Sequence, residues 1–105
     1  MSTNEVKNKL KLYAKVLREN KINFSCIYLF GSYSSGRQKF ESDIDVAVII
    51  PKIGKGAFEL ESKLWTLAPQ VDSRIEPVLL EENDIQSGTA SMVGSEVRKA
   101  GVRVV

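Results

Sequence analysis

The chain has 105 residues, of which 43% are hydrophobic and 27% charged, and its formal net charge is +2. This length suits a single domain over residues 1–105 with one modest core, too short for a separate substrate-recognition domain. The absence of histidine excludes Ser-His-Asp and Cys-His catalysis within the chain and any His-ligated zinc site. A net charge of +2 is too small to indicate a nucleic-acid binder. Local clusters of basic residues still leave nucleic-acid binding open.

No segment reaches the apolar length of a membrane span, and the N-terminus lacks the apolar core of a signal peptide. We therefore expect a cytoplasmic protein without a membrane anchor. The single cysteine, Cys26, cannot form an internal disulfide, and its place in an apolar run indicates a buried thiol. The chemistry of this chain must therefore depend on carboxylates, hydroxyls, cations and metal ions.

The first expected element is an amphipathic helix. Ser2 and Glu5 have the spacing of a capping box, and apolar residues then recur at intervals of four, three and four. We expect this helix to end near Asn20 and to cover one face of a sheet. The apolar run 24–30 follows as a first strand, and Gly31 permits a tight turn directly after it.

Two carboxylates stand at the start of the second expected strand. Asp43 and Asp45 lead into the β-branched run 46–50, which predicts a buried strand. Alternate residues of a strand share a face, so these two side chains lie on one face with Cα atoms about 6–7 Å apart. Converging carboxylates that lose hydration need a cation or a shared proton. Oxygen ligands without His or Cys favour Mg²⁺ or Mn²⁺.

The turn between these strands predicts an anion site. If residues 33–41 begin a short helix, Ser32 and the amides after it can hold a phosphate beside the metal site. Arg37 and Lys39 lie in the same polar segment and either contact a triphosphate or are simply solvated. On the alternative interpretation the turn is an ordinary one, and Ser42 only caps the entry to the next strand.

A glycine-rich connection and a second helix come next. Lys52 and Lys55 in the connection either reach a substrate or remain solvated. Residues 57–67 have the spacing of an amphipathic helix, which Pro69 stops. We expect Trp65 on this helix to pack in the core.

The remaining elements complete a mixed sheet. Residues 71–80 predict a third strand, which Pro77 restricts to an edge or a break in the ladder. A last helix starts near Ser91 and ends at Gly101, which suits a left-handed cap, and residues 102–105 form a short strand. Strands alternate with helices across turns of mixed length, so the fold class is α+β or α/β with a mixed sheet flanked by helices.

The combination of the Gly-Ser turn with Asp-x-Asp ten residues later resembles the signature of the DNA-polymerase-β-like nucleotidyltransferases. The closest resemblance is to the minimal nucleotidyltransferases, in which Gly-Ser-x-x-x-Gly precedes Ser-Asp-Ile-Asp and a hydrophobic residue. The resemblance implies the mixed α+β fold of that family. The matching residues are Gly31, Ser32, Gly36, Ser42, Asp43 and Asp45.

The resemblance also implies a third acidic residue from a neighbouring strand. Glu76 is our candidate because apolar residues flank it, and Asp72 is the alternative. The family more often has Asp at this position. On this interpretation Asp43, Asp45 and Glu76 are the catalytic residues and hold two Mg²⁺ ions, with Mn²⁺ as the other candidate metal. The nucleotide is held by the side chains or backbone of Gly31, Ser32, Ser42, Arg37 and Lys39.

The activity implied by the resemblance is transfer of a nucleoside monophosphate from ATP, or another NTP, to a hydroxyl group. Minimal members resemble the antitoxin half of two-component modules, whose partner is a separate helical protein of HEPN type. Some members adenylylate a tyrosine of that partner, which makes a toxin the expected acceptor. Two alternatives remain: a binding subunit that neutralises its partner by contact alone, and an enzyme that modifies a small molecule or an RNA end. A homo-oligomer also stays open.

Overall fold

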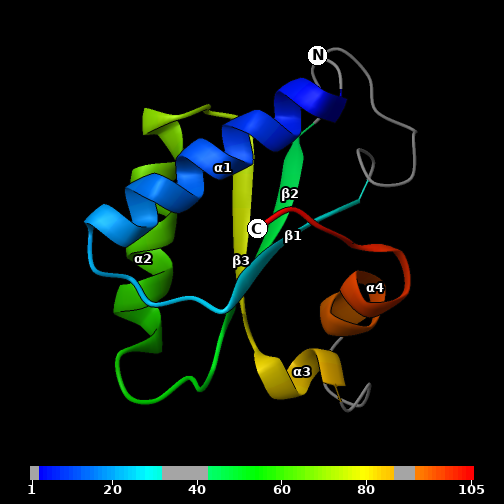
Figure 1. Ribbon diagram of the computed structural model, residues 1–105. Coiled ribbons are helices and arrows are strands. Elements are labelled where there is room, and N and C mark those ends of the chain that lie inside the picture. Colours follow the sequence, from blue (N-terminus) through cyan, green and yellow to red (C-terminus); the bar gives the residue numbers. More distant parts are fainter. Residues whose placement is uncertain (1–2, 32–42, 87–91) are drawn as a thin grey trace.

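A computed structural model describes residues 3–31, 43–86 and 92–105. Four strands form one sheet in the order β3-β2-β1-β4. The first three of these are labelled in Figure 1. β1 pairs antiparallel with β2 and with β4, whereas β2 and β3 run parallel. The expected mixed α+β sheet is therefore confirmed. The strands are β1 (Cys26–Phe30), β2 (Ile44–Ile50), β3 (Ile75–Glu81) and β4 (Val102–Arg103).

Helices cover both faces of this sheet. The first face carries α1 (Thr3–Glu19) and α2 (Ala57–Leu67), and a short 3₁₀ turn, η1 (Ala68–Gln70), follows α2 at Pro69. The second face carries α3 (Glu82–Gln86) and α4 (Met92–Ala100). Among the described residues no helix is both long enough and apolar enough to cross a membrane.

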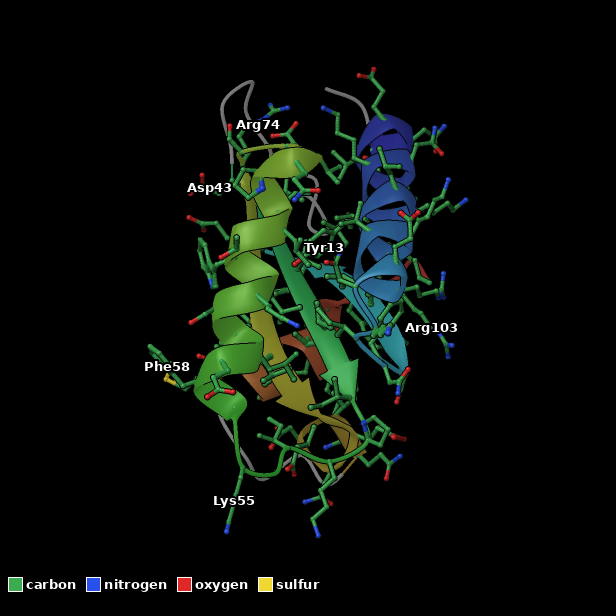
Figure 2. The ribbon with its side chains drawn as sticks, turned by 90° about the vertical axis from the view of Figure 1, so that its left-hand side faces the viewer. Tyr13, Asp43, Lys55, Phe58, Arg74 and Arg103 are labelled. Atoms are coloured by element: carbon green, nitrogen blue, oxygen red, sulfur yellow. The ribbon has the colours of Figure 1, made fainter. Side chains whose placement is uncertain are left out.

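The larger core lies between the sheet and the layer formed by α1 and α2. The expected apolar stripe of α1 is fully buried there, with Leu10 and Tyr13 both at 0% exposure. The Tyr13 hydroxyl donates a 2.8 Å hydrogen bond to the Leu64 carbonyl of α2, which joins the two helices. Ile44 and Val46 of β2 point into this core from the sheet. Tyr13 lies between α1 and α2 in Figure 2.

The smaller core lies on the second face, under α3 and α4. Since successive strand residues alternate between faces, Ala47 and Ile49 point away from α1 and pack against Val97 of α4. Cys26 belongs to this cluster, and burial raises the pKa of its thiol. The expected buried cysteine is therefore confirmed.

Three expectations for this part of the chain need correction. Trp65 is 50% exposed rather than in the core, because Leu64 and Leu67 occupy the positions of α2 that face the sheet. Gly101 does not form a left-handed cap, since Gly31 and Gly56 are the glycines with positive φ among the described residues. The third strand starts at residue 75 rather than 71, because Asp72 makes a turn before it.

Candidate active site

The three candidate carboxylates lie on the second face of the sheet, at the end where β2 begins. Asp45 stands opposite Glu76 in the parallel pairing of β2 with β3. Asp43 directly precedes β2, and its charge acts on the Asp45 carboxyl two residues later. Val78 continues that face of β3 and packs in the smaller core beside α4. The fold therefore brings Asp43, Asp45 and Glu76 to one edge of the α4 face.

Asp45 is the centre of this group. The pKa of its carboxyl is raised to about 6, mainly by burial and then by the neighbouring charges of Glu76, Asp43 and Glu96. A side-chain hydrogen bond with Glu76 contributes further to this increase in the pKa of Asp45. All of these influences favour the protonated form of the Asp45 carboxyl.

Gly31 brings the backbone of the turn after β1 against the same carboxylate. Its φ is +73°, a conformation that L side chains rarely adopt. A Cβ added at Gly31 would lie 3.1 Å from Cγ and 3.2 Å from Cβ of Asp45, and closer still to a carboxylate oxygen. Only glycine fits this position, so the turn that begins the Gly-Ser motif touches the Asp-x-Asp motif directly.

The donor set of this group fits a hard divalent cation. Asp43, Asp45 and Glu76 offer only carboxylate oxygens, which Mg²⁺ and Mn²⁺ prefer, and their crowded charges favour a cation. Among the described residues no three acidic or thiol side chains already form a closed ligand set. A cation bound by these carboxylates would offset the repulsion that raises the pKa of Asp45.

Asp72, the alternative third carboxylate, has other partners. It lies 2.6 Å from Lys9 Nζ and 2.8 Å from Arg74 Nη2, and its side chain is 7% exposed. Burial alone would raise its pKa, but the hydrogen bonds from Lys9 and Arg74 outweigh this and lower the pKa to about 2. Asp72 therefore ties α1 to the turn before β3 and remains ionised.

The other expected site residues fall into two groups. Ser32, Arg37, Lys39 and Ser42 lie outside the described residues. Lys55 lies at the opposite end of the molecule from Asp43 (Figure 2). The connection that also holds Lys52 follows the far end of β2, about 20 Å along the strand from its start.

Glu96 is a residue of this site that the sequence analysis missed. It is exposed on α4, next to the buried Val97, and its charge acts on Asp45. The pattern of one helix gives no indication of this, because the effect of Glu96 on Asp45 depends on how α4 packs over the sheet. Val93 and Val97 are four residues apart and pack on the sheet. This helical spacing is the one signal that could have placed Glu96 at the edge of the same face of α4.

Comparisons with known proteins agree with this geometry. The sequence model of the family described as "Polymerase beta, Nucleotidyltransferase" matches residues 8–90. A 35-residue stretch is 57% identical to "Protein adenylyltransferase MntA" of Shewanella oneidensis strain MR-1, and it makes up 33% of this chain and 25% of that protein. The likeness to this curated relative thus spans only a quarter of its length.

Solved structures share the fold over nearly the whole chain. A putative nucleotidyltransferase from Sulfolobus solfataricus has a TM-score of 0.67 at 16% identity, covering 96% of this chain and 80% of that one, and so shows the fold alone. A toxin-antitoxin structure with AMP-PNP has a TM-score of 0.58 at 35% identity, covering 94% and 72%. A structure of the toxin-antitoxin MntA-HepT has a TM-score of 0.56 at 27% identity, covering 97% and 71%.

The resemblance indicated by the Gly-Ser and Asp-x-Asp motifs is confirmed by these likenesses, which extend well beyond the motifs themselves. The family match includes all three strands that surround the carboxylates. The chain belongs to the polymerase-β nucleotidyltransferase family, and its relatives include MntA-type proteins.

Proposed function

We propose that this chain transfers AMP from ATP to a hydroxyl group of a partner toxin of HEPN type, and so acts as a protein adenylyltransferase antitoxin. The observation that carries the proposal is the convergence of Asp45, Glu76 and the backbone of Gly31 at one edge of the sheet. We place the whole site in one nucleotidyltransferase domain over residues 1–105, working in the cytoplasm on cellular ATP.

Each residue of the site has a role in this proposal. Asp43, Asp45 and Glu76 would hold the Mg²⁺ ions of a two-metal mechanism through their carboxylate oxygens. When bound, the metal neutralises the triphosphate and lowers the pKa of the attacking hydroxyl. The backbone at Gly31 and Ser32 holds the β- and γ-phosphates, aided by Ser42, Arg37 and Lys39. Alignment and charge neutralisation account for most of the acceleration.

The choice of acceptor is supported by the relatives. One of them is a protein adenylyltransferase, and several are subunits of toxin-antitoxin complexes. The AMP-PNP complex favours ATP as the nucleotide donor. Asp72, by contrast, is already neutralised by Lys9 and Arg74, so we assign the third ligand position to Glu76.

The proposal is tested by incubating the chain with its co-expressed cognate toxin, Mg²⁺ and ATP labelled at either the α- or the γ-phosphate. We expect α-label on the toxin and none from γ-labelled ATP, since pyrophosphate leaves. The Asp43→Ala, Asp45→Ala double variant should lose transfer by about 1000-fold or more, because ligands to the metal ions are removed. Glu61→Ala is the matched control, as Glu61 is exposed on α2 and away from the site.

Other outcomes would replace the proposal. If the double variant still neutralises the toxin in cells as well as wild type, the chain acts by binding alone. If label appears instead on RNA ends or on a small-molecule hydroxyl without the toxin, the acceptor is different. If wild type transfers no label to any acceptor, the enzymatic proposal is wrong.

A further inference from the structure

The turn before β3 is held by the side chain of Asp72. Its carboxylate accepts three hydrogen bonds from Arg74, from the backbone amide at 2.8 Å, from Nε at 3.0 Å and from Nη2 at 2.8 Å. Lys9 Nζ of α1 lies 2.6 Å from one oxygen of the same carboxylate. The Asp72 carbonyl also accepts a 3.1 Å hydrogen bond from the Ile75 amide. Because hydrogen bonds between charged groups are stronger than neutral ones, they fix this turn and attach it to α1.

Arg74 connects the turn to the strand that carries the two aspartates. Its carbonyl accepts a 2.8 Å hydrogen bond from the Ile44 amide, and this amide belongs to the peptide that joins Asp43 to Ile44. The bond comes directly before the parallel pairing that puts Asp45 opposite Glu76. Figure 2 shows Arg74 and Asp43 at the same end of the molecule. One carbonyl therefore joins the backbone next to the aspartates to the start of the strand that carries Glu76.

The spacing of the carboxylates depends on how β2 and β3 are aligned. A slip of one residue moves one strand along the other by about 3.3 Å. Mg²⁺ requires its oxygen ligands at about 2.0–2.1 Å in near-octahedral geometry, so its site tolerates only much smaller displacements. β3 is an edge strand of the sheet and is held by a neighbouring strand on one side alone. A contact that aligns the start of β3 with β2 therefore affects the metal site.

We propose that Lys9, Asp72 and Arg74 form a brace that positions the carboxylates of the metal site, and that Asp72 is a positioning residue for nucleotidyl transfer without being a metal ligand itself. The inference rests on the proposed function, since it concerns the same site. Through the brace, α1 fixes the turn before β3 and so the distance from Glu76 to the two aspartates. Loss of the Asp72 charge leaves two cations without their partner and releases the turn.

Binding of Mn²⁺ to the purified chain, followed by electron paramagnetic resonance of the free ion, tests the positioning role. We expect Asp72→Asn to weaken Mn²⁺ binding by about tenfold, because residues that support metal ligands typically contribute this much to affinity. Tyr13→Phe is the matched control. It removes one hydrogen bond between α1 and α2, away from the starts of β2 and β3, and should bind Mn²⁺ as wild type does.

A double variant separates positioning from simple electrostatics. Asp72→Asn also removes a negative charge near the cation site, and this alone weakens cation binding. Adding Lys9→Gln removes a positive charge as well, so the net charge returns to that of wild type while the brace stays broken. We expect the double variant to bind Mn²⁺ about as weakly as Asp72→Asn does.

Hydrogen exchange of the Ile44 amide reports the brace without any metal. Asp72→Asn should speed the exchange of this amide by about tenfold, because the hydrogen bond to the Arg74 carbonyl opens more often. The amide of Val48, in the middle of β2, is the internal reference and should change less.

The outcomes distinguish the inference from the proposed function. If wild type binds Mn²⁺ and transfers label, but Asp72→Asn matches Tyr13→Phe in Mn²⁺ affinity, the inference alone is overturned. Recovery of wild-type affinity in the double variant would also overturn it, since the effect would then be one of charge. If wild type itself binds no Mn²⁺, the proposed metal site is wrong and the inference falls with it.

Discussion

The two faces of the sheet differ in what they contain. Of the described residues, seventeen buried side chains form the core under α1 and α2, and six form the core under α3 and α4. The larger core holds no charged side chain, whereas the other face holds Asp45 and Glu76. This comparison teaches that stability and chemistry are divided between the two sides of one sheet. Substitutions on one side should therefore affect folding, and substitutions on the other should affect activity.

The largest difference should come from truncating one apolar side chain on each face. Leu10→Ala removes a fully buried side chain from the larger core and should lower the free energy of unfolding by about 3 kcal/mol. Val93→Ala removes a partly buried side chain of α4 and should cost less than about 1 kcal/mol. Urea denaturation of both variants measures this. Equal losses would contradict the division between the faces.

The next effect concerns the turn that touches Asp45. Gly31→Ala forces a side chain into a position with positive φ and against the Asp45 carboxylate, so it should cost about 2 kcal/mol and reduce nucleotide transfer at least about tenfold. Gly54→Ala is the matched control, because nothing lies within 4 Å of a Cβ added there. Thermal unfolding and the transfer assay report the two effects. A Gly31→Ala variant as active and stable as the control would show that the contact has no importance.

A smaller effect comes from the hydrogen bond that joins α1 to α2. Tyr13→Phe should lower the free energy of unfolding by about 1 kcal/mol and leave activity unchanged, because the bond lies on the first face. The cost stays low since the Leu64 carbonyl also accepts a hydrogen bond from the Ala68 amide. Urea denaturation and the transfer assay together check this. A loss of transfer without a loss of stability would contradict it.

The smallest effect is a pH dependence that originates on the second face. Because the folded chain raises the pKa of Asp45 to about 6, it binds more protons than the unfolded chain between pH 4 and 6. Stability from this group is fully present below about pH 4 and falls as pH rises to 6, by about 1 kcal/mol after allowance for solvent screening. Asp72, whose pKa is lowered to about 2, acts only at more acidic pH and with the opposite sign.

Asp45→Asn should flatten this profile and be the more stable protein at pH 7 without metal, although it loses transfer. Urea midpoints at pH 4 and 7, without Mg²⁺, give the comparison. Mg²⁺ should stabilise wild type at pH 7 and not the variant, since the cation binds the ionised Asp45 carboxylate, which the variant lacks. If the midpoint of wild type rises steadily from pH 4 to 6, the assignment of the raised pKa is wrong.

Local patterns in the sequence were enough to place much of this architecture. The period of α1, the buried β-branched strand β2 and the edge position of the strand with Pro77 all follow from neighbouring residues, and each is confirmed. The shared face of Asp43 and Asp45 stays a prediction, because β2 begins only at Ile44.

What could not be predicted depends on contacts between distant parts of the chain. Asp72 is bound by Lys9, 63 residues away, and Glu96 reaches Asp45 only because of the packing of α4. Trp65 was wrongly expected in the core because two apolar neighbours compete for the same side of α2, and only the finished fold decides between them. The roles of Arg37 and Lys39 stay predictions.

The margins of the sheet have a consequence for the behaviour of the chain in a crowded cell. One margin is β3, in which Pro77 has no amide hydrogen to offer, and the other is β4, which is two residues long. A long, uninterrupted margin would act as a template on which further chains could add strands and grow into fibrils. Neither margin provides one, so the fold is protected against this kind of aggregation.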